Sequence, residues 1–147
     1  RGIRAPADLG ARKRIAAGAG LYDDMCAACH LGPGVERSEL SQGLYPQAPE
    51  LNRRSDLGPA EQFWIIKHGV KLSAMPAWGK THDDELIWDM VAFVRQLPNM
   101  SPEQYKAAIA NAPADHEEMM EGRPGEAHES APKPHRHSHA EGSEHHH

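Results

Sequence analysis

Two cysteines and a histidine lie close together near the start of the chain, in the sequence Cys26-Ala27-Ala28-Cys29-His30. This C-x-x-C-H spacing is the attachment motif of c-type haem. Two thiols three residues apart can each form a thioether with one edge of a porphyrin, and the next residue then comes under the iron. The motif therefore predicts that Cys26 and Cys29 hold a haem covalently and that His30 is an axial ligand of its iron.

Two other uses of the cysteine pair explain less of the sequence. A redox disulfide of this spacing normally accompanies a βαβ pattern, and no segment shows convincing strand alternation. A zinc site needs four ligands, usually from two ligand pairs, and no second pair lies before the polar C-terminal segment. Haem attachment is therefore the preferred interpretation of the motif.

A second axial ligand is expected among the six methionines. Met75 differs from the others because Pro76 disfavours helix at Met75 and keeps its backbone extended. Met75 also follows His30 by 45 residues, which is enough chain to pass round a haem edge and return. Methionine is a common haem ligand opposite histidine, where it raises the reduction potential of the iron. The position and the extended backbone of Met75 make it the predicted sixth ligand. The alternative is a loop residue that fills a gap in the core.

The other methionines have simpler interpretations. Met25 adjoins Cys26 and is expected on the wrong side of the haem to face His30. Met90 lies on the apolar stripe of a predicted helix and is assigned to the core. The remaining three lie in a linker or in the polar C-terminal segment: Met100, Met119 and Met120.

Helices must position these residues, and the fold class is predicted to be all-α. Apolar residues recur at helical spacing at about residues 9–29 and 82–97. Pro59 suits the first position of a helix and Gly69 its end, so the apolar run between them predicts a short helix over about residues 59–69. A fourth short helix is predicted at about residues 102–110. Thr81 and Asp84 resemble a capping box before the segment at residues 82–97, and Ser101-Pro102-Glu103-Gln104 opens the fourth helix. Residues 31–58 contain many glycines and prolines and are predicted to be loop, as are residues 70–80.

Charge and hydrophobicity divide the chain into a domain and a tail. Residues 1–111 contain 13 basic and 13 acidic residues, whereas residues 112–147 contain 3 basic and 8 acidic ones and carry the whole net charge of −5. The latter segment holds 8 of the 11 histidines and no Val, Ile, Leu, Phe, Trp, Tyr or Cys, so it cannot build a core. We predict a domain over residues 10–111 and a disordered, acidic, histidine-rich tail over residues 112–147.

The two ends of the chain allow several interpretations. Because the chain starts with Arg1, residues 1–9 are predicted to be an extension left from a signal peptide or a membrane anchor. The tail is interpreted as a solvating segment, as a weak binding site for Cu, Zn or Ni, or, for His145-His146-His147, as an expression tag. No apolar run approaches the length of a membrane span, and the mild negative charge argues against nucleic-acid binding.

The motifs resemble those of class I cytochromes c, over roughly residues 10–110. The matching elements, in chain order, are Gly18, Tyr22, Cys26-Ala27-Ala28-Cys29-His30, Pro49-Glu50-Leu51, Met75-Pro76-Ala77-Trp78 and the helical run Asp89-Met90-Val91-Ala92-Phe93-Val94. The resemblance implies a cytochrome c-like fold of roughly three to five short helices around one covalent haem c. It also implies His/Met ligation of the iron, and places Gly18 and Tyr22 where the first helix crosses the helix of Met90 and Phe93.

The resemblance further implies which residues surround the haem. The carbonyl of Pro49, with Pro46 as the runner-up, is expected to accept a hydrogen bond from His30. The residues expected to pack against the macrocycle are Leu51, Phe63, Trp64 and Ile66. The residues expected to donate hydrogen bonds to the haem propionates are Trp78, Arg53, Arg54 and Lys71, with surface solvation as the alternative for the three charged ones.

These inferences predict a one-electron carrier and not an enzyme, because an iron with both axial positions filled has no place for a substrate. The protein is expected to shuttle electrons between transiently bound donor and acceptor proteins of a respiratory or related chain. Its expected location is the bacterial periplasm, either soluble or tethered to the membrane. Three alternatives stay open: a haem enzyme or sensor, a cytochrome c subunit of a membrane-bound oxidase or reductase complex, and a haem protein coupled to copper handling through the tail.

Overall fold

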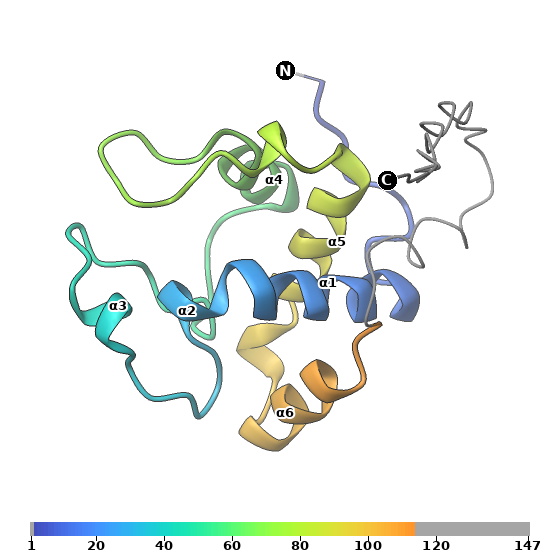
Figure 1. Ribbon diagram of the computed structural model, residues 1–147. Coiled ribbons are helices and arrows are strands. Elements are labelled where there is room, and N and C mark those ends of the chain that lie inside the picture. Colours follow the sequence, from blue (N-terminus) through green and yellow to red (C-terminus); the bar gives the residue numbers. More distant parts are fainter. Residues whose placement is uncertain (1, 114–147) are drawn as a thin grey trace, which may run out of the picture.

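The computed structural model describes residues 2–113, and within this range the chain forms helices joined by loops, without a strand (Figure 1). The helices are α1 (Arg12–Met25), α2 (Ala27–His30), α3 (Glu39–Gln42), α4 (Pro59–His68), η1 (Trp78–Lys80), α5 (Asp84–Val94), η2 (Leu97–Asn99) and α6 (Pro102–Ala110). The predicted all-α class is confirmed. From residue 114 onwards, the predicted tail lies outside the described residues. No helix in the described range has both the length and the hydrophobicity of a membrane span.

Helices α1 and α5 cross at close range in the centre of the fold (Figure 1). Gly18 permits this approach, because a Cβ at its position would lie 1.9 Å from the carbonyl oxygen of Asp89 and 2.8 Å from the Cβ of Phe93. The rings of Tyr22 and Phe93 are fully buried, with their centroids 5.4 Å apart. The structure therefore contains the helix crossing that the sequence predicts for Gly18 and Tyr22.

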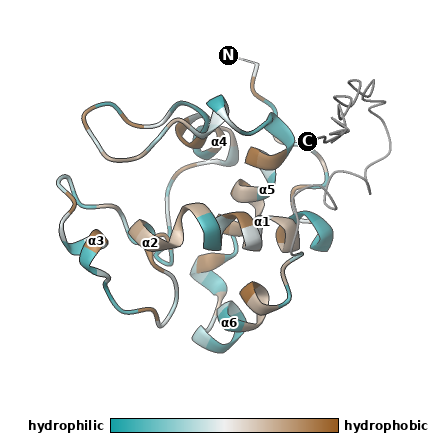
Figure 2. Cartoon of the chain, in the orientation of Figure 1, coloured by the Kyte–Doolittle hydropathy of each residue, from teal (hydrophilic) through white to brown (hydrophobic). Residues whose placement is uncertain are grey.

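The hydrophobic core forms two clusters around this crossing. In the first, α4 packs on α5 through Phe63 and Trp88, whose stacked rings have centroids 4.2 Å apart. In the second, the ring of Tyr105 on α6 meets that of Tyr22 edge-on at 6.3 Å. Tyr105 also covers the turn after α2, since a Cβ on Gly32 would lie 2.5 Å from its ring. In Figure 2, α1 and α6 mix hydrophilic with hydrophobic residues, which is typical of helices with one solvent-facing side.

Ion pairs around the buried guanidinium of Arg14 also join α1 to α5. The guanidinium of Arg14 lies 2.9 Å from a carboxylate oxygen of Glu85 and 2.9 Å from one of Asp89, which is fully buried. A third carboxylate, that of Asp8 in the segment before α1, lies 3.0 Å from the same guanidinium. Two apolar residues of that segment pack against the first core cluster: Ile3 and Leu9. The segment before α1 is therefore held by both ionic and apolar contacts.

The start of α5 differs from the predicted one. The N-cap is Asp83, whose carboxylate accepts a hydrogen bond from the backbone N–H of Leu86 at 3.0 Å. Thr81 was expected to cap the helix together with Asp84, but its hydroxyl lies 2.8 Å from Nδ1 of His82 instead. An aspartate directly before the first turn is the better cap, because its charge also interacts favourably with the helix dipole.

The predicted ends of α4 and the predicted start of α6 are confirmed, whereas α1 and α5 end earlier than expected, at Met25 and Val94. Pro59 is the first residue of α4, and Gly69 follows its last residue with a φ of +70°. At the start of α6, the Ser101 hydroxyl accepts from the N–H of Gln104 at 3.1 Å. The Gln104 side chain in turn accepts from the N–H of Ser101 at 2.9 Å, which completes a capping box.

The tight crossing gives a first testable prediction. Gly18→Ala is expected to lower the free energy of unfolding by about 3 kcal/mol, because the added methyl group would force two helix backbones apart. Denaturant unfolding of the purified protein measures this loss. Gly10→Ala is the matched control, since a Cβ on Gly10 would meet no atom within 4 Å. Equal stability of the two variants would contradict the close approach of α1 and α5.

Candidate functional site

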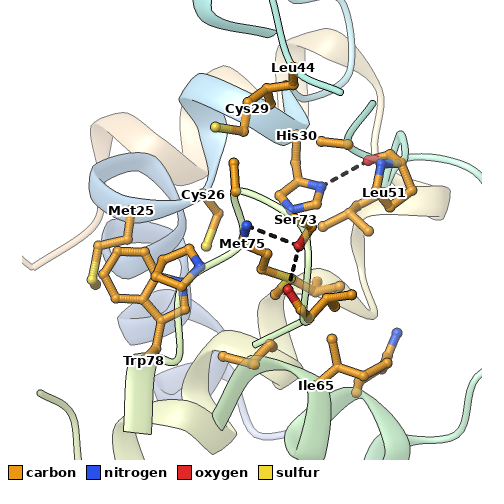
Figure 3. A pocket seen from close by; sticks show the side chains of 18 of the residues that line it. Met25, Cys26, Cys29, His30, Leu44, Leu51, Ile65, Ser73, Met75 and Trp78 are labelled. Atoms are coloured by element: carbon orange, nitrogen blue, oxygen red, sulfur yellow. Dashed lines mark hydrogen bonds between the residues drawn. The ribbon is translucent and has the colours of Figure 1, made fainter. Parts of the chain in front are cut away.

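A cavity of about 370 Å³ lies between the end of α1, the helices α2 and α4, and the loops on both sides of α4. Cys26, Cys29, His30 and Met75 all line it, and Figure 3 shows them around one space. Binding sites for organic cofactors have volumes of roughly 300–1,000 Å³ and mostly apolar walls with a few polar groups. The fold therefore brings together the four residues that the sequence singles out for haem binding.

His30 is oriented by a hydrogen bond to the loop that follows α3. Its Nδ1 lies 2.9 Å from the carbonyl oxygen of Pro49 (Figure 3). A carbonyl oxygen only accepts, so Nδ1 carries the proton and donates it in this bond. The lone pair of the neutral ring then lies on Nε2, which is the nitrogen a metal would bind. The structure thus contains the histidine–proline contact expected from the sequence.

The two cysteines line the cavity at the junction between α1 and α2. This junction ends the first helix earlier than the sequence predicts. Helix α1 stops at Met25, Cys26 follows it as C-cap, and α2 is a single turn that contains Cys29. Burial, together with the nearby Cys29, raises the pKa of the Cys26 thiol to about 12.

Met75 lies in the loop between α4 and η1 and is partly buried. Its side chain packs against the first core cluster, together with Trp78 and Met25. Met25 also lines the cavity, although the sequence places it on the wrong side of the haem. The structure therefore brings a second methionine, the residue directly before Cys26 in the chain, to the cavity wall.

Two of the four residues expected to pack against the macrocycle, Leu51 and Ile66, line the cavity, but Phe63 and Trp64 do not. Leu51, Ile66 and Trp78 are among the lining residues, whereas Phe63 faces α5. Trp64 is 52% exposed.

The direction of Trp64 follows from the geometry of α4. Successive helical residues are rotated by about 100°, so Trp64 points away from the side that Ile65 and Ile66 share. Its ring lies beside that of His68 instead, with centroids 4.7 Å apart. The expected contact between Trp64 and the macrocycle is thus not supported by this arrangement. Ile65 takes the place on the wall. The sequence does not indicate this, because adjacent apolar residues on a short helix do not reveal which side of the helix each occupies.

The charged residues expected to bind the haem propionates are exposed. These are Arg53, Arg54 and Lys71. Arg53 forms an ion pair with Glu50 at 3.0 Å. Trp78 is the member of the expected donor set that lines the cavity.

The donor set of the cavity fits haem iron better than a free metal ion. Within residues 2–113, no group of three or more His, Cys, Asp or Glu side chains is arranged to hold a metal ion. An imidazole, a thioether and two thiols on an apolar wall match the axial ligands and attachment points of a c-type haem. The cavity is thus suited to a flat apolar macrocycle held at its edge.

Comparison with known proteins agrees with this geometry. Residues 13–94 match the model of a family described as cytochrome c oxidase, cbb3-type, subunit III. The match covers more than half of the chain and extends from α1 through the cysteine motif to the end of α5. Searches of curated proteins and of solved structures gave no match. The chain therefore belongs to the cbb3-type cytochrome c oxidase subunit III family, as a class I cytochrome c domain that binds haem c covalently and transfers electrons.

Proposed function

We propose that the protein is a one-electron carrier whose haem is attached to Cys26 and Cys29 and whose iron is bound by His30 and Met75. The convergence of these four side chains on one apolar cavity supports the proposal most directly. Bound haem would supply an Fe(III)/Fe(II) couple. With an imidazole and a thioether as axial ligands, the iron has no open position for a substrate, so the proposed role is electron transfer without enzymatic turnover.

The residues around the cavity would keep this coordination unchanged between the two oxidation states. The hydrogen bond from His30 to the Pro49 carbonyl fixes the ring and raises its basicity as a ligand. Pro76 restricts the backbone of Met75. The largely apolar walls would disfavour water around a bound haem. A site that rearranges little on reduction is suited to transferring single electrons.

Apolar residues at the edge of the cavity support docking of a redox protein there. Leu57 and Val70 line the cavity and are 38% and 47% exposed. Electron-transfer complexes are usually small, with less than about 1,200 Å² of surface buried. Since basic and acidic residues balance in residues 1–111, attraction by net charge is weak, and apolar contacts would contribute most of the affinity.

The optical spectrum tests the proposal. The oxidised protein is expected to show the weak far-red band of a methionine–iron bond, and the reduced protein is expected to bind CO poorly. A missing far-red band together with ready CO binding would contradict His/Met ligation. That result would favour a haem enzyme or gas sensor instead.

A second candidate is that the domain delivers electrons inside a membrane-bound oxidase complex. The description of the matching family favours this candidate, since it names an oxidase subunit. For both candidates we propose a periplasmic location, soluble or tethered to the membrane. Co-purification with oxidase activity from detergent-extracted membranes would support the complex, and recovery in the soluble fraction alone would support the free carrier. Copper handling by the tail depends on residues outside the described range and stays a prediction from the sequence.

A further inference from the structure

The loop that carries Met75 is fixed at both ends against the end of α4. At Gly69, with φ +70°, a Cβ would lie 2.8 Å from the carbonyl oxygen of Met75 and 3.0 Å from the N of Ala77. At Gly79, a Cβ would lie 2.8 Å from the carbonyl oxygen of Lys67. The backbone on either side of the loop therefore lies directly on the last turn of α4.

The outer part of this loop has little apolar support. Leu72 has a φ of +61°, a conformation that residues other than glycine rarely adopt. Its side chain is 97% exposed, so burial does not hold the turn in place. On the side that precedes Met75 in the chain, the polar contacts of the turn therefore add to the hold that Gly69 and the core give its backbone.

Ser73 provides these contacts. Its hydroxyl donates a hydrogen bond to the carbonyl oxygen of Val70 at 2.7 Å and accepts one from the backbone N–H of Met75 at 3.3 Å (Figure 3). Ser73 also lines the cavity, so its hydroxyl stabilises the turn next to the cavity wall. The hydroxyl links the start of the turn to the N–H of Met75.

We propose that Ser73 is a positioning residue that holds Met75 in place as an axial ligand. The proposal depends on the proposed ligation by Met75. A methionine side chain has three rotatable bonds and gives its sulfur little direction of its own. The direction of the backbone at Met75 consequently sets how often the sulfur leaves the iron, and the Ser73 hydroxyl fixes that backbone.

Competition with imidazole in the haem-loaded protein tests this role, because imidazole binds the iron only when the sulfur has left. Ser73→Ala removes both hydrogen bonds of the hydroxyl and is expected to bind imidazole at least about five-fold more tightly than the wild type. Ser73→Thr, which keeps the hydroxyl, is expected to restore the wild-type affinity to within about two-fold. The far-red band of the oxidised protein should weaken in Ser73→Ala in parallel.

Ser55→Ala is the matched control. The Ser55 hydroxyl also accepts from the N–H two residues later, that of Leu57, at 3.1 Å, and Ser55 lines the same cavity. It lies in a different loop, before α4, so Ser55→Ala is expected to bind imidazole as the wild type does. An equal increase in Ser55→Ala and Ser73→Ala would overturn the proposal, because the effect would then be a general loosening of the cavity.

Two further outcomes separate this proposal from the ligand assignment. If Met75→Ala binds imidazole far more tightly than the wild type but Ser73→Ala does not, Met75 is the ligand and Ser73 has no positioning role. If Met75→Ala binds imidazole as the wild type does, Met75 is not the ligand, and both proposals fail. A Ser73→Thr variant that behaves like Ser73→Ala would also overturn the role of the hydroxyl.

Discussion

Replacing Met75 with alanine is expected to abolish the far-red band of the oxidised protein and to lower the reduction potential by about 0.1 V or more, within the ~0.8 V range that axial ligands control. The thioether stabilises the reduced iron, and alanine leaves that position open to water or an added ligand. The reduced variant should therefore bind CO readily. A redox titration followed by absorbance measures both the potential and the band.

Met25→Ala is the control for this prediction, because Met25 is the other methionine that lines the cavity. It is expected to keep the far-red band and to change the potential far less than Met75→Ala. If Met25→Ala loses the band and Met75→Ala keeps it, the assignment of the sixth ligand is reversed. The two variants thus decide between the two sulfurs by one measurement.

Without haem, the domain is expected to lose its cooperative fold. An unfilled apolar cavity costs about 24 cal/mol per Å³, so the cavity of about 370 Å³ corresponds to an upper bound of about 9 kcal/mol. The total stability of a domain is only about 5–15 kcal/mol. The loss is therefore comparable to the whole free energy of folding.

Circular dichroism of the chain produced without haem attachment measures this effect. The haem-free chain should show reduced helix content and no sharp thermal transition, and the haem-loaded chain at the same concentration is the control. A haem-free chain that melts cooperatively with native helix content would contradict the prediction. The two core clusters would then hold the fold without the cofactor.

The parts of the fold that the sequence predicts are those encoded by local patterns. The Cys26–His30 motif is defined by spacing alone, and the helix of Met90 and Phe93 is defined by a clear apolar stripe. Pro59 and Gly69 mark the ends of α4 because their backbone preferences act within one or two residues. The crossing of α1 and α5 is predicted only through the resemblance to class I cytochromes c. In that family a glycine and an aromatic residue one turn later, here Gly18 and Tyr22, lie at the crossing.

The features that the sequence does not predict depend on contacts between distant residues. Arg14 looks like a solvated residue until the fold brings the buried carboxylate of Asp89, 75 positions away, within 2.9 Å of it. The side of α4 that Trp64 occupies is set by how the helix lies on α5, and four adjacent apolar residues do not indicate it. The support of Met75 by Ser73 is equally hidden, because serines are common in loops.

The contacts of Tyr105 and Asp8 bear on where the folding unit begins and ends. Both residues lie outside residues 13–94, the range that matches the family. Tyr105 covers Gly32, two residues after His30, and Asp8 completes the ion pairs of Arg14. A fragment cut at the limits of the family match would keep every proposed haem ligand, yet it would expose Tyr22 and leave Arg14 with fewer partners. The segment that matches the family is therefore shorter than the segment whose contacts hold the fold together.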